Sequence, residues 1–313
     1  MSRTDLSFDV AIIGGGPAGM SAVLWCADLG LRCVLIEKSA ELGGQLLWIH
    51  NPIENYPGIS THNGAEIRDK FASSLKDAAF ERMLGAEVES IDTEQKRIEL
   101  KDGPSIRAKA IIIATGVRRR KLNIPGEIEF TGRGILESGS KDRELVQGKS
   151  VIIVGGGDAA MENAMILSEY ASSVTVVHRR AQFSARAGFL GKARSLSNIE
   201  FLMEATVTKI AGSDRLEKVA VRNTETGELR TIETDFLLIR IGVEPNSEFV
   251  EEVVALDGRG YIKIDNNCMT NREGVYAVGD VAYPLSPTVS TAVGTGAIAV
   301  KATNHWIYQA KSL

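Results

Sequence analysis

The sequence is poor in cysteine. Its 313 residues contain only three cysteines, Cys26, Cys33 and Cys268. Three cysteines at these spacings provide neither an even disulfide framework nor a metal-binding cluster. We therefore expect no metal site, and a reduced, cytoplasmic protein is the default expectation.

Long apolar runs and a strong charge imbalance are also missing. No apolar run approaches the roughly 20 residues that span a bilayer, and the polar residues 1–9 lead directly into an apolar segment, which argues against a secretory signal. The composition is 44% apolar and 24% charged, with a net charge of −4. We expect neither a membrane nor nucleic acid as a partner. The length suffices for about two domains with substantial cores.

The sequence does contain one glycine pattern twice, at Gly14–Gly19 and at Gly155–Ala160. Each copy follows a short apolar segment and precedes a helical stretch and a second apolar segment. In dinucleotide-binding folds, the backbone amides of such a turn and the helix N-terminus bind a pyrophosphate. The sequence therefore predicts an α/β protein with two Rossmann-like dinucleotide-binding domains.

The two copies differ in charge where the second strand ends. Glu37 lies 21 residues after Gly16, and His178 lies 21 residues after Gly157 and begins the run His178-Arg179-Arg180. An acid at this position binds a free ribose 2′-hydroxyl, whereas arginines accept a 2′-phosphate. A charge-assisted hydrogen bond contributes roughly 1.5–3 kcal/mol, so two arginines could favour NADPH over NADH by about a hundredfold or more. A solvated basic strand end is the alternative interpretation.

The repeat continues beyond the glycine turns. Each half then shows a β excursion, with hairpins expected at 102–103 and 225–227, and a buried strand that ends in glycine. After residue 244 we expect a short strand near 261–264 and a long helix over about 288–309, too little for a third domain. The second half is therefore predicted to be inserted into the first through two hinge crossings. The predicted bounds are 1–117 and 247–313 for the first domain and 118–246 for the second.

Several further motifs occur in order along the chain: Gly43-Gly44-Gln45-Leu46, Glu54-Asn55-Tyr56-Pro57-Gly58, Ala114-Thr115-Gly116, His178-Arg179-Arg180 and Gly279-Asp280. With this set, the sequence resembles the bacterial low-molecular-weight thioredoxin reductases over essentially its whole length. The resemblance implies FAD in the first domain, NADPH in the second, and a homodimer. It implies no catalytic side chain for hydride transfer, because that chemistry belongs to the cofactors.

The resemblance also implies which residues bind each cofactor. It places Val88 and Ala114 near the adenosine, Asp280 on the ribityl chain, and the helix starting near Val289 with its N-terminus toward the flavin ring. The residues implied for FAD are Gly14, Gly16, Pro17, Ala18, Gly19, Glu37, Lys38, Gly44, Gln45, Asn55, Val88, Ala114, Thr115, Gly116, Gly279, Asp280 and Val289. Those implied for NADPH are Gly155, Gly157, Asp158, Ala159, His178, Arg179, Arg180 and Arg186, the last in place of an arginine that the family often carries at position 184.

The sequence departs from this family where the redox dithiol would lie. The family's Cys-x-x-Cys-Asp falls between a Gly-Arg-Gly, here 132–134, and the second glycine turn. Here that interval reads Ser138-Gly139-Ser140-Lys141-Asp142, so only the acid remains. Asp142 could protonate a product, although a lone surface aspartate is the simpler interpretation. Cys26 and Cys33 have apolar neighbours and are expected to be inert core residues, so we predict no dithiol relay.

The electron acceptor stays open. The cluster Arg118-Arg119-Arg120-Lys121 is either a solvated face at the hinge or a docking patch for an acidic carrier such as ferredoxin or flavodoxin. The other enzyme hypothesis is direct reduction of a small acceptor, such as a disulfide, a quinone or oxygen. A flavin- and NADPH-binding redox sensor or assembly protein without turnover is the alternative from another class.

Overall fold

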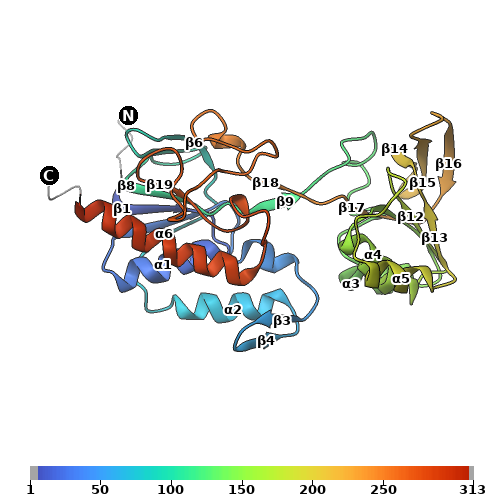
Figure 1. The fold of residues 1–313 in the computed structure, drawn as a ribbon, viewed down its shortest axis with the longest axis horizontal. Coiled ribbons are helices and arrows are strands. Elements are labelled where there is room, and N and C mark those ends of the chain that lie inside the picture. The colour runs from blue at the N-terminus through green and yellow to red at the C-terminus, as the bar shows by residue number, and fades with distance from the viewer. Residues whose placement is uncertain (1–5, 310–313) are drawn as a thin grey trace. The chain divides into compact units, whose positions relative to one another are not determined.

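The computed structural model describes residues 6–309, which divide into two compact units (Figure 1). The first unit comprises the chain up to Arg118 and again from Glu244, and the second comprises Arg119–Val243. The two linking segments pair with each other as the short strands β9 (Val117–Arg119) and β18 (Val243–Pro245). No helix among residues 6–309 combines the length and apolar character needed to cross a bilayer.

Arg118 and residues 244–246, which we expected in the second domain, belong to the first unit. Hydrogen bonds explain this placement. The Thr115 hydroxyl donates to the Asn246 carbonyl at 2.7 Å, and Asn246 Nδ2 donates to the Thr115 carbonyl at 2.8 Å. Arg118 Nε also donates to Glu244 Oε1 at 2.9 Å.

The first unit is built on a mainly parallel sheet in the order β5-β2-β1-β8-β7-β6, with β19 also paired to β8. Side chains of β1 alternate between two cores: Val10 and Ile12 pack with the helices, whereas Ala11 and Ile13 face the opposite side. Burial on both faces explains why this strand is almost wholly apolar. The strands are β1 (Leu6–Ile13), β2 (Cys33–Glu37), β5 (Glu81–Leu84), β6 (Val88–Asp92), β7 (Arg97–Leu100), β8 (Ile106–Ile113) and β19 (Val275–Ala277).

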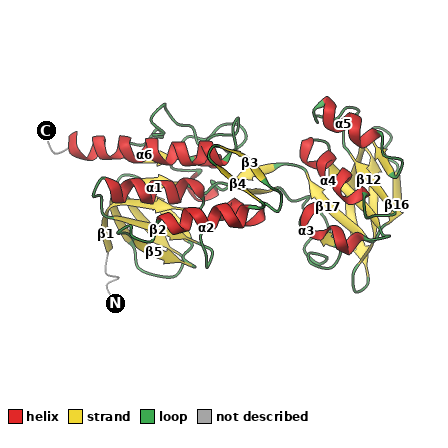
Figure 2. Cartoon of the chain, turned by 90° about the horizontal axis from the view of Figure 1, so that it is seen from below, coloured by secondary structure: helices red, strands yellow, loops and turns green. Residues whose placement is uncertain are grey.

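Helices α1 and α6 lie side by side against this sheet (Figure 2). The helices of the first unit are α1 (Pro17–Asp28), α2 (Gly64–Ser74) and α6 (Val289–Gln309), with short 3₁₀ turns η1 (Gly44–Trp48), η3 (Glu248–Val250) and η4 (Gly279–Val281). A small hairpin, β3 (Ile53–Tyr56) and β4 (Ile59–Thr61), completes the unit.

The second unit repeats this plan with a parallel sheet in the order β10-β17-β11-β12-β13 and a separate antiparallel sheet β14-β15-β16. Its strands are β10 (Ile135–Leu136), β11 (Ser150–Gly155), β12 (Ser173–Val177), β13 (Ile199–Leu202), β14 (Ala205–Gly212), β15 (Leu216–Asn223), β16 (Leu229–Glu233) and β17 (Phe236–Arg240). Its helices are α3 (Gly139–Asp142), α4 (Asp158–Ser168) and α5 (Ala187–Arg194), with the 3₁₀ turn η2 (Arg143–Val146).

The architecture confirms the predicted fold class of two Rossmann-like units, each with a strand, a glycine turn and a helix. The hairpins at 102–103 and 225–227 and the long C-terminal helix are also confirmed. The expected strand near 261–264 is wrong. Its amides bond to two different segments, Ile262 N to the Val281 carbonyl and Lys263 N to the Ala255 carbonyl, so no continuous ladder forms.

Candidate functional site

The first glycine turn joins β1 to α1. Gly14 has φ of +110°, and a Cβ added there would lie 2.4 Å from the Ala114 carbonyl oxygen. A Cβ on Gly19 would lie 1.9 Å from the Gly14 carbonyl oxygen, so helix and strand approach too closely for any side chain. Gly16 is the N-cap, Pro17 begins the helix, and no side chain caps it. The first N–H groups of α1 are therefore available to an oxyanion such as a pyrophosphate.

Glu37 ends β2 beside this turn, and backbone amides hold its carboxylate. Gly15 N donates to Oε2 at 2.6 Å, and Ser39 N donates to Oε1 at 2.8 Å. Because a carboxylate has about four acceptor positions, both oxygens can still accept a ribose hydroxyl. The position and orientation of Glu37 thus suit the predicted role.

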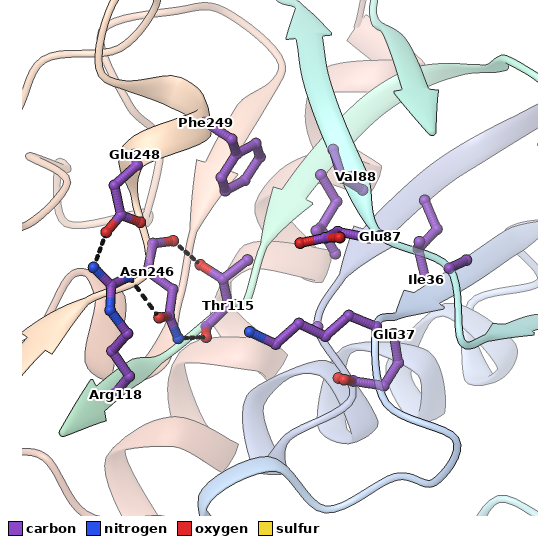
Figure 3. Close-up of a pocket in the computed structure, with 13 residues that line it drawn as sticks. Ile36, Glu37, Glu87, Val88, Thr115, Arg118, Asn246, Glu248 and Phe249 are labelled. Atoms are coloured by element: carbon purple, nitrogen blue, oxygen red, sulfur yellow. Dashed lines mark hydrogen bonds and ion pairs between the residues drawn. The ribbon is translucent and has the colours of Figure 1, made fainter. Parts of the chain in front are cut away.

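A cavity of about 310 Å³ opens next to Glu37 (Figure 3). It brings together five residues that the sequence predicted for FAD: Gly14, Glu37, Lys38, Val88 and Thr115. The other lining residues were not predicted, and they are Ile13, Ile36, Ala86, Glu87, Arg118, Asn246, Glu248 and Phe249. The last three come from the segment by which the chain returns to the first unit, and no motif in the sequence marks them.

Arg118 connects the residues that form one wall of this cavity. Its guanidinium forms an ion pair with Glu244 at 2.8 Å. It also pairs with Glu248, and its Nη1 donates to Asn246 Oδ1 at 3.2 Å (Figure 3). The hydrogen bond to Glu248 raises the pKa of Arg118 above its ordinary value. Two acids in the same unit therefore balance the charge of Arg118, whose side chain stays 43% exposed.

Asp280, in η4, is a desolvated acid. Burial raises the pKa of its carboxyl to about 6, and no group among residues 6–309 donates a hydrogen bond to it. Its neighbour Gly279 donates its N–H to the Thr295 hydroxyl, and a Cβ on Gly279 would lie 3.1 Å from the Ala18 Cβ. This contact places η4 beside the first turn of α1. A desolvated carboxylate without a partner fits a sugar hydroxyl donor, as in the ribityl chain of FAD.

The remaining residues predicted for FAD are distributed around this turn. A Cβ on Gly44 would lie 3.1 Å from the Gly16 Cα, and Gln45 Nε2 donates to the Val117 carbonyl at 2.8 Å. Ala114 and Gly116 follow the end of β8, and Val289 begins α6. Asn55 is exposed on β3 and does not line the cavity.

The second glycine turn, between β11 and α4, has the same geometry. A Cβ on Gly155 would lie 2.2 Å from the Arg240 carbonyl oxygen, whereas the space above Gly157, the N-cap of α4, is open except for Ser184 Oγ at 3.7 Å. Asp158 follows, and Ala159 lies in the first helical turn. Arg186 pairs with Asp158, with Nε to Oδ2 at 2.6 Å, and hydrogen bonding to the Arg186 N–H lowers the pKa of Asp158. The charge of Arg186 is thus engaged by Asp158.

His178 packs as part of the turn. A Cβ on Gly156 would lie 2.2 Å from its ring, which stacks on Phe183 at 5.0 Å and shares a 3.0 Å hydrogen bond with the Gln182 carbonyl. Burial lowers the pKa of His178, and the charges of Arg180 and Arg179 lower it further. A neutral imidazole cannot pair with a phosphate as a cation. Of the three residues predicted to bind the 2′-phosphate, the two exposed arginines, Arg179 and Arg180, therefore remain as its charged partners.

This geometry yields a matched pair of substitutions. Gly156→Ala is expected to lower the unfolding temperature, because its Cβ would overlap the His178 ring, which stacking and a hydrogen bond hold in place. Gly157→Ala is expected to keep that temperature within about a degree and to weaken NADPH binding at least about tenfold, because its methyl group projects where the pyrophosphate would lie. Thermal unfolding and NADPH titration measure the two effects. Equal unfolding temperatures for both variants would contradict the packing role of His178.

The segment at residues 138–142 forms a tight turn. Asp142 is only 8% exposed, and its Oδ2 accepts hydrogen bonds from the amides of Glu137, at 2.6 Å, and Ser138, at 2.9 Å. The expectation of a surface aspartate is wrong, because Asp142 stabilises the turn that precedes α3. The amide of Gly139 donates to Asn163 Oδ1 at 2.7 Å and holds the turn against α4.

The three cysteines are all free and buried. Cys26 and Cys33 are 0% and 1% exposed, and a hydrogen bond between the two thiols, together with burial, raises the pKa of Cys26. Burial also raises the pKa of Cys268, whose Sγ lies 3.5 Å from the Tyr283 hydroxyl. A raised pKa disfavours the reactive thiolate of Cys26 and Cys268. The hydrogen bond with Cys26 lowers the pKa of Cys33 instead, but this thiol has almost no contact with solvent.

Comparison with known proteins decides the family. The family model described as "Pyridine nucleotide-disulphide oxidoreductase" matches residues 8–296. The chain belongs to this family. It is 33% identical over 301 residues to the thioredoxin reductase of Bacillus subtilis (strain 168), covering 96% of this chain and 95% of that protein. It is 31% identical over 307 residues to the "34.2 kDa protein in rubredoxin operon" of Clostridium pasteurianum, covering 97% and 99% of the two chains.

Solved structures agree with this assignment. The crystal structure of Lactococcus lactis thioredoxin reductase in its FR conformation superposes with a TM-score of 0.85 at 34% identity, covering 96% of this chain and 99% of that chain. The protein is thus a thioredoxin reductase-like oxidoreductase with two dinucleotide-binding domains, and the family uses FAD and NADPH. The two glycine turns, the amide-held Glu37 and the desolvated Asp280 fit these cofactors.

Proposed function

We propose that this protein passes electrons from NADPH through FAD directly to an external acceptor, without an internal dithiol. One observation carries the proposal. Ser138 and Lys141 stand where the resembling family has its redox cysteines, and none of the three cysteines of the sequence forms a Cys-x-x-Cys pair. The burial of all three cysteines supports it.

The two cofactors, when bound, supply hydride transfer and onward electron transfer. The chain's own residues bind and orient them. In the first unit, the amides of the Gly14–Gly19 turn would face the pyrophosphate, Glu37 would accept from the adenosine ribose, and Asp280 would accept from the ribityl chain. In the second unit, the turn at Gly155–Gly157 plays the same part. Arg179 and Arg180 would donate to the 2′-phosphate of NADPH.

The acceptor that we favour is a small molecule such as a disulfide or a quinone. A protein carrier such as ferredoxin or flavodoxin would need a continuous basic surface. In the candidate cluster, Arg118 is paired with Glu244 and Glu248, so its charge does not contribute to such a surface. This arrangement supports the small acceptor. We also propose that the protein is a homodimer, as its resemblance implies, and that it is cytoplasmic, as its low cysteine content suggests.

Anaerobic mixing with NADPH tests the proposal. The flavin absorbance of the holoprotein should bleach, and a small disulfide or quinone should restore it at a rate that salt changes little. No bleaching would indicate a redox sensor or assembly protein. Reoxidation only by ferredoxin or flavodoxin, slowed by added salt, would establish the carrier function instead.

A second experiment tests the direct route from flavin to acceptor. Cys26→Ala, Cys33→Ala and Cys268→Ala are expected to change turnover per bound flavin by less than about threefold, because no buried thiol carries electrons. NADPH oxidation, normalised to flavin content, measures this. The hydrogen-bonded pair Cys26 and Cys33 makes the test stringent. A disulfide between them that forms during turnover, detected by mass spectrometry after alkylation, would contradict the proposal.

A further inference from the structure

Two arginines of the second unit converge on one carbonyl group at the carboxyl edge of its parallel sheet. Arg240 ends β17, where it is paired with Gly155 of the glycine turn. Its Nη2 donates to the Glu137 carbonyl at 2.6 Å, and Arg119 Nη1 donates to the same oxygen. The two guanidinium groups therefore lie side by side, above the turn that replaces the dithiol.

The positive charge of this pair is poorly compensated. Burial and then the charge of Arg119 lower the pKa of Arg240 to about 10, against the opposing effect of Asp142 and Glu162. Burial also lowers the pKa of Arg119. A lowered pKa means that the surroundings disfavour the cation, although arginine is normally the most persistent positive charge in a protein.

The carboxylates of Asp142 and Glu137 each have other partners. Asp142 Oδ2 accepts from two backbone amides, and the Glu137 carboxylate pairs with Lys141. No residue among those described accepts from Nε or Nη2 of Arg119, or from Nε of Arg240. A bound anion would supply both the missing charge and the missing acceptors.

The place of the pair in the sheet indicates which ligand meets it. The sheet order is β10-β17-β11-β12-β13, and dinucleotides lie across the carboxyl ends of such strands. The adenosine end would lie at β12, beside Arg179 and Arg180, and the pyrophosphate would lie at the turn after β11. Arg240 after β17 and Glu137 after β10 lie beyond that turn, at the end where the reactive ring and its reaction partner would lie.

We propose that Arg119 and Arg240 form an oxyanion-binding site for a carboxylate, sulfonate or phosphate group. The paired planar forks match the geometry of such groups. Two ligands could carry the oxyanion, an acidic small acceptor or the nicotinamide-side phosphate of NADPH, and the choice between them rests on the function proposed above. The site itself requires only that an oxyanion bind.

Titration with inorganic sulfate tests the site without any turnover. Calorimetry would use a protein with Arg179→Ala and Arg180→Ala, so that the predicted 2′-phosphate site does not contribute. Adding Arg240→Met is expected to weaken sulfate binding at least about tenfold, since it removes one fork of the pair. Arg119→Met should weaken sulfate binding in the same way, and this variant replaces Arg240→Met in the test if Arg240→Met fails to fold. Arg230→Met, at an exposed position on β16, is the matched control and should change nothing.

Half-reactions identify the source of the oxyanion. Holoprotein reduced with dithionite is mixed with naphthoquinone or with its sulfonate, and oxidised holoprotein is mixed with NADPH. If the acceptor carries the group, Arg240→Met slows reoxidation by the sulfonate at least about tenfold relative to the neutral quinone and leaves NADPH bleaching unchanged. If NADPH carries it, bleaching weakens and both quinones react as before.

These outcomes separate the two proposals. Sulfate binding that stays within about twofold in both arginine variants overturns the oxyanion site. Lost sulfate binding in a protein that NADPH never bleaches leaves the site standing and overturns the proposed function.

Discussion

Replacing Arg179 and Arg180 with alanine is expected to reduce the preference for NADPH over NADH by about a hundredfold or more. Both side chains are exposed beside the second glycine turn, where a 2′-phosphate would lie. The two other candidate groups are engaged elsewhere, since His178 is kept neutral by burial and Arg186 pairs with Asp158. The loss should fall on NADPH alone, because NADH has no phosphate at this position.

The measurement is the ratio of kcat/KM for NADPH to that for NADH, or the ratio of bleaching rates at limiting coenzyme. Arg222→Ala, at an exposed position on β15 of the same unit, is the control and should leave the ratio unchanged. An unchanged ratio in the double variant would mean that other residues read the phosphate. A collapse of the ratio in Arg186→Ala instead would identify Arg186 as the phosphate-binding residue.

The sequence could predict both glycine turns because each motif is contiguous in the chain and needs glycine at fixed positions. Gly14 and Gly155 have positive φ angles and backbone contacts that leave no room for a Cβ, so glycine is required at both positions. The apolar strands before the turns are buried on both faces, which makes them recognisable as parallel strands. Fold class therefore follows from short stretches of sequence.

The cavity wall could not be predicted because its residues are distant in the chain. Arg118 meets Asn246 and Glu248 only when the chain returns from the second unit, and the hydrogen bonds between Thr115 and Asn246 set where it re-enters. Nothing in the local composition of 244–250 indicates a ligand site. The same reasoning explains why we predicted that the second domain ends at residue 246, whereas the second unit ends at Val243.

The roles of charged residues were the hardest to predict from the sequence, because burial in the folded protein changes the role that their sequence context suggests. Asp142 reads as a surface residue but caps a turn from a buried position. The sequence suggests that Arg119 belongs to a solvated basic run, but its side chain is partly buried beside Arg240, the last residue of the apolar strand β17. Hydrogen-bond partners supplied by distant backbone decide these cases, and only the fold brings them together.

Asp280→Asn is expected to weaken FAD binding by about ten- to a hundredfold, while making the FAD-free protein more stable near neutral pH. The first effect follows from replacing a charge-assisted hydrogen bond, worth roughly 1.5–3 kcal/mol, by a neutral one. The second follows from burial, which raises the pKa of Asp280 from 3.8 to about 6 in the folded protein. Ionising this carboxyl without a partner is unfavourable, and asparagine carries no charge.

The pH dependence gives the sign of the second effect. Below the ordinary pKa of an aspartate, about 3.9, the carboxyl is protonated in both folded and unfolded chains, so Asp280 imposes no penalty. As the pH rises through about 6, the unfolded chain releases the proton more readily, and the folded state loses stability on the order of 1–3 kcal/mol. The unfolding temperature of FAD-free Asp280→Asn should therefore exceed that of the parent by a few degrees near pH 7.5, with little difference near pH 4.

Thermal unfolding of the FAD-free protein and titration with FAD, followed by flavin fluorescence, measure the two effects independently. Asp102→Asn, at an exposed loop position in the same unit, is the control and should change neither. A residue that only stabilised the fold would lose stability when substituted and would lower FAD affinity through that loss. Opposite changes in stability and affinity therefore mark Asp280 as a cofactor ligand, whereas a fall in FAD-free stability near neutral pH would contradict that role.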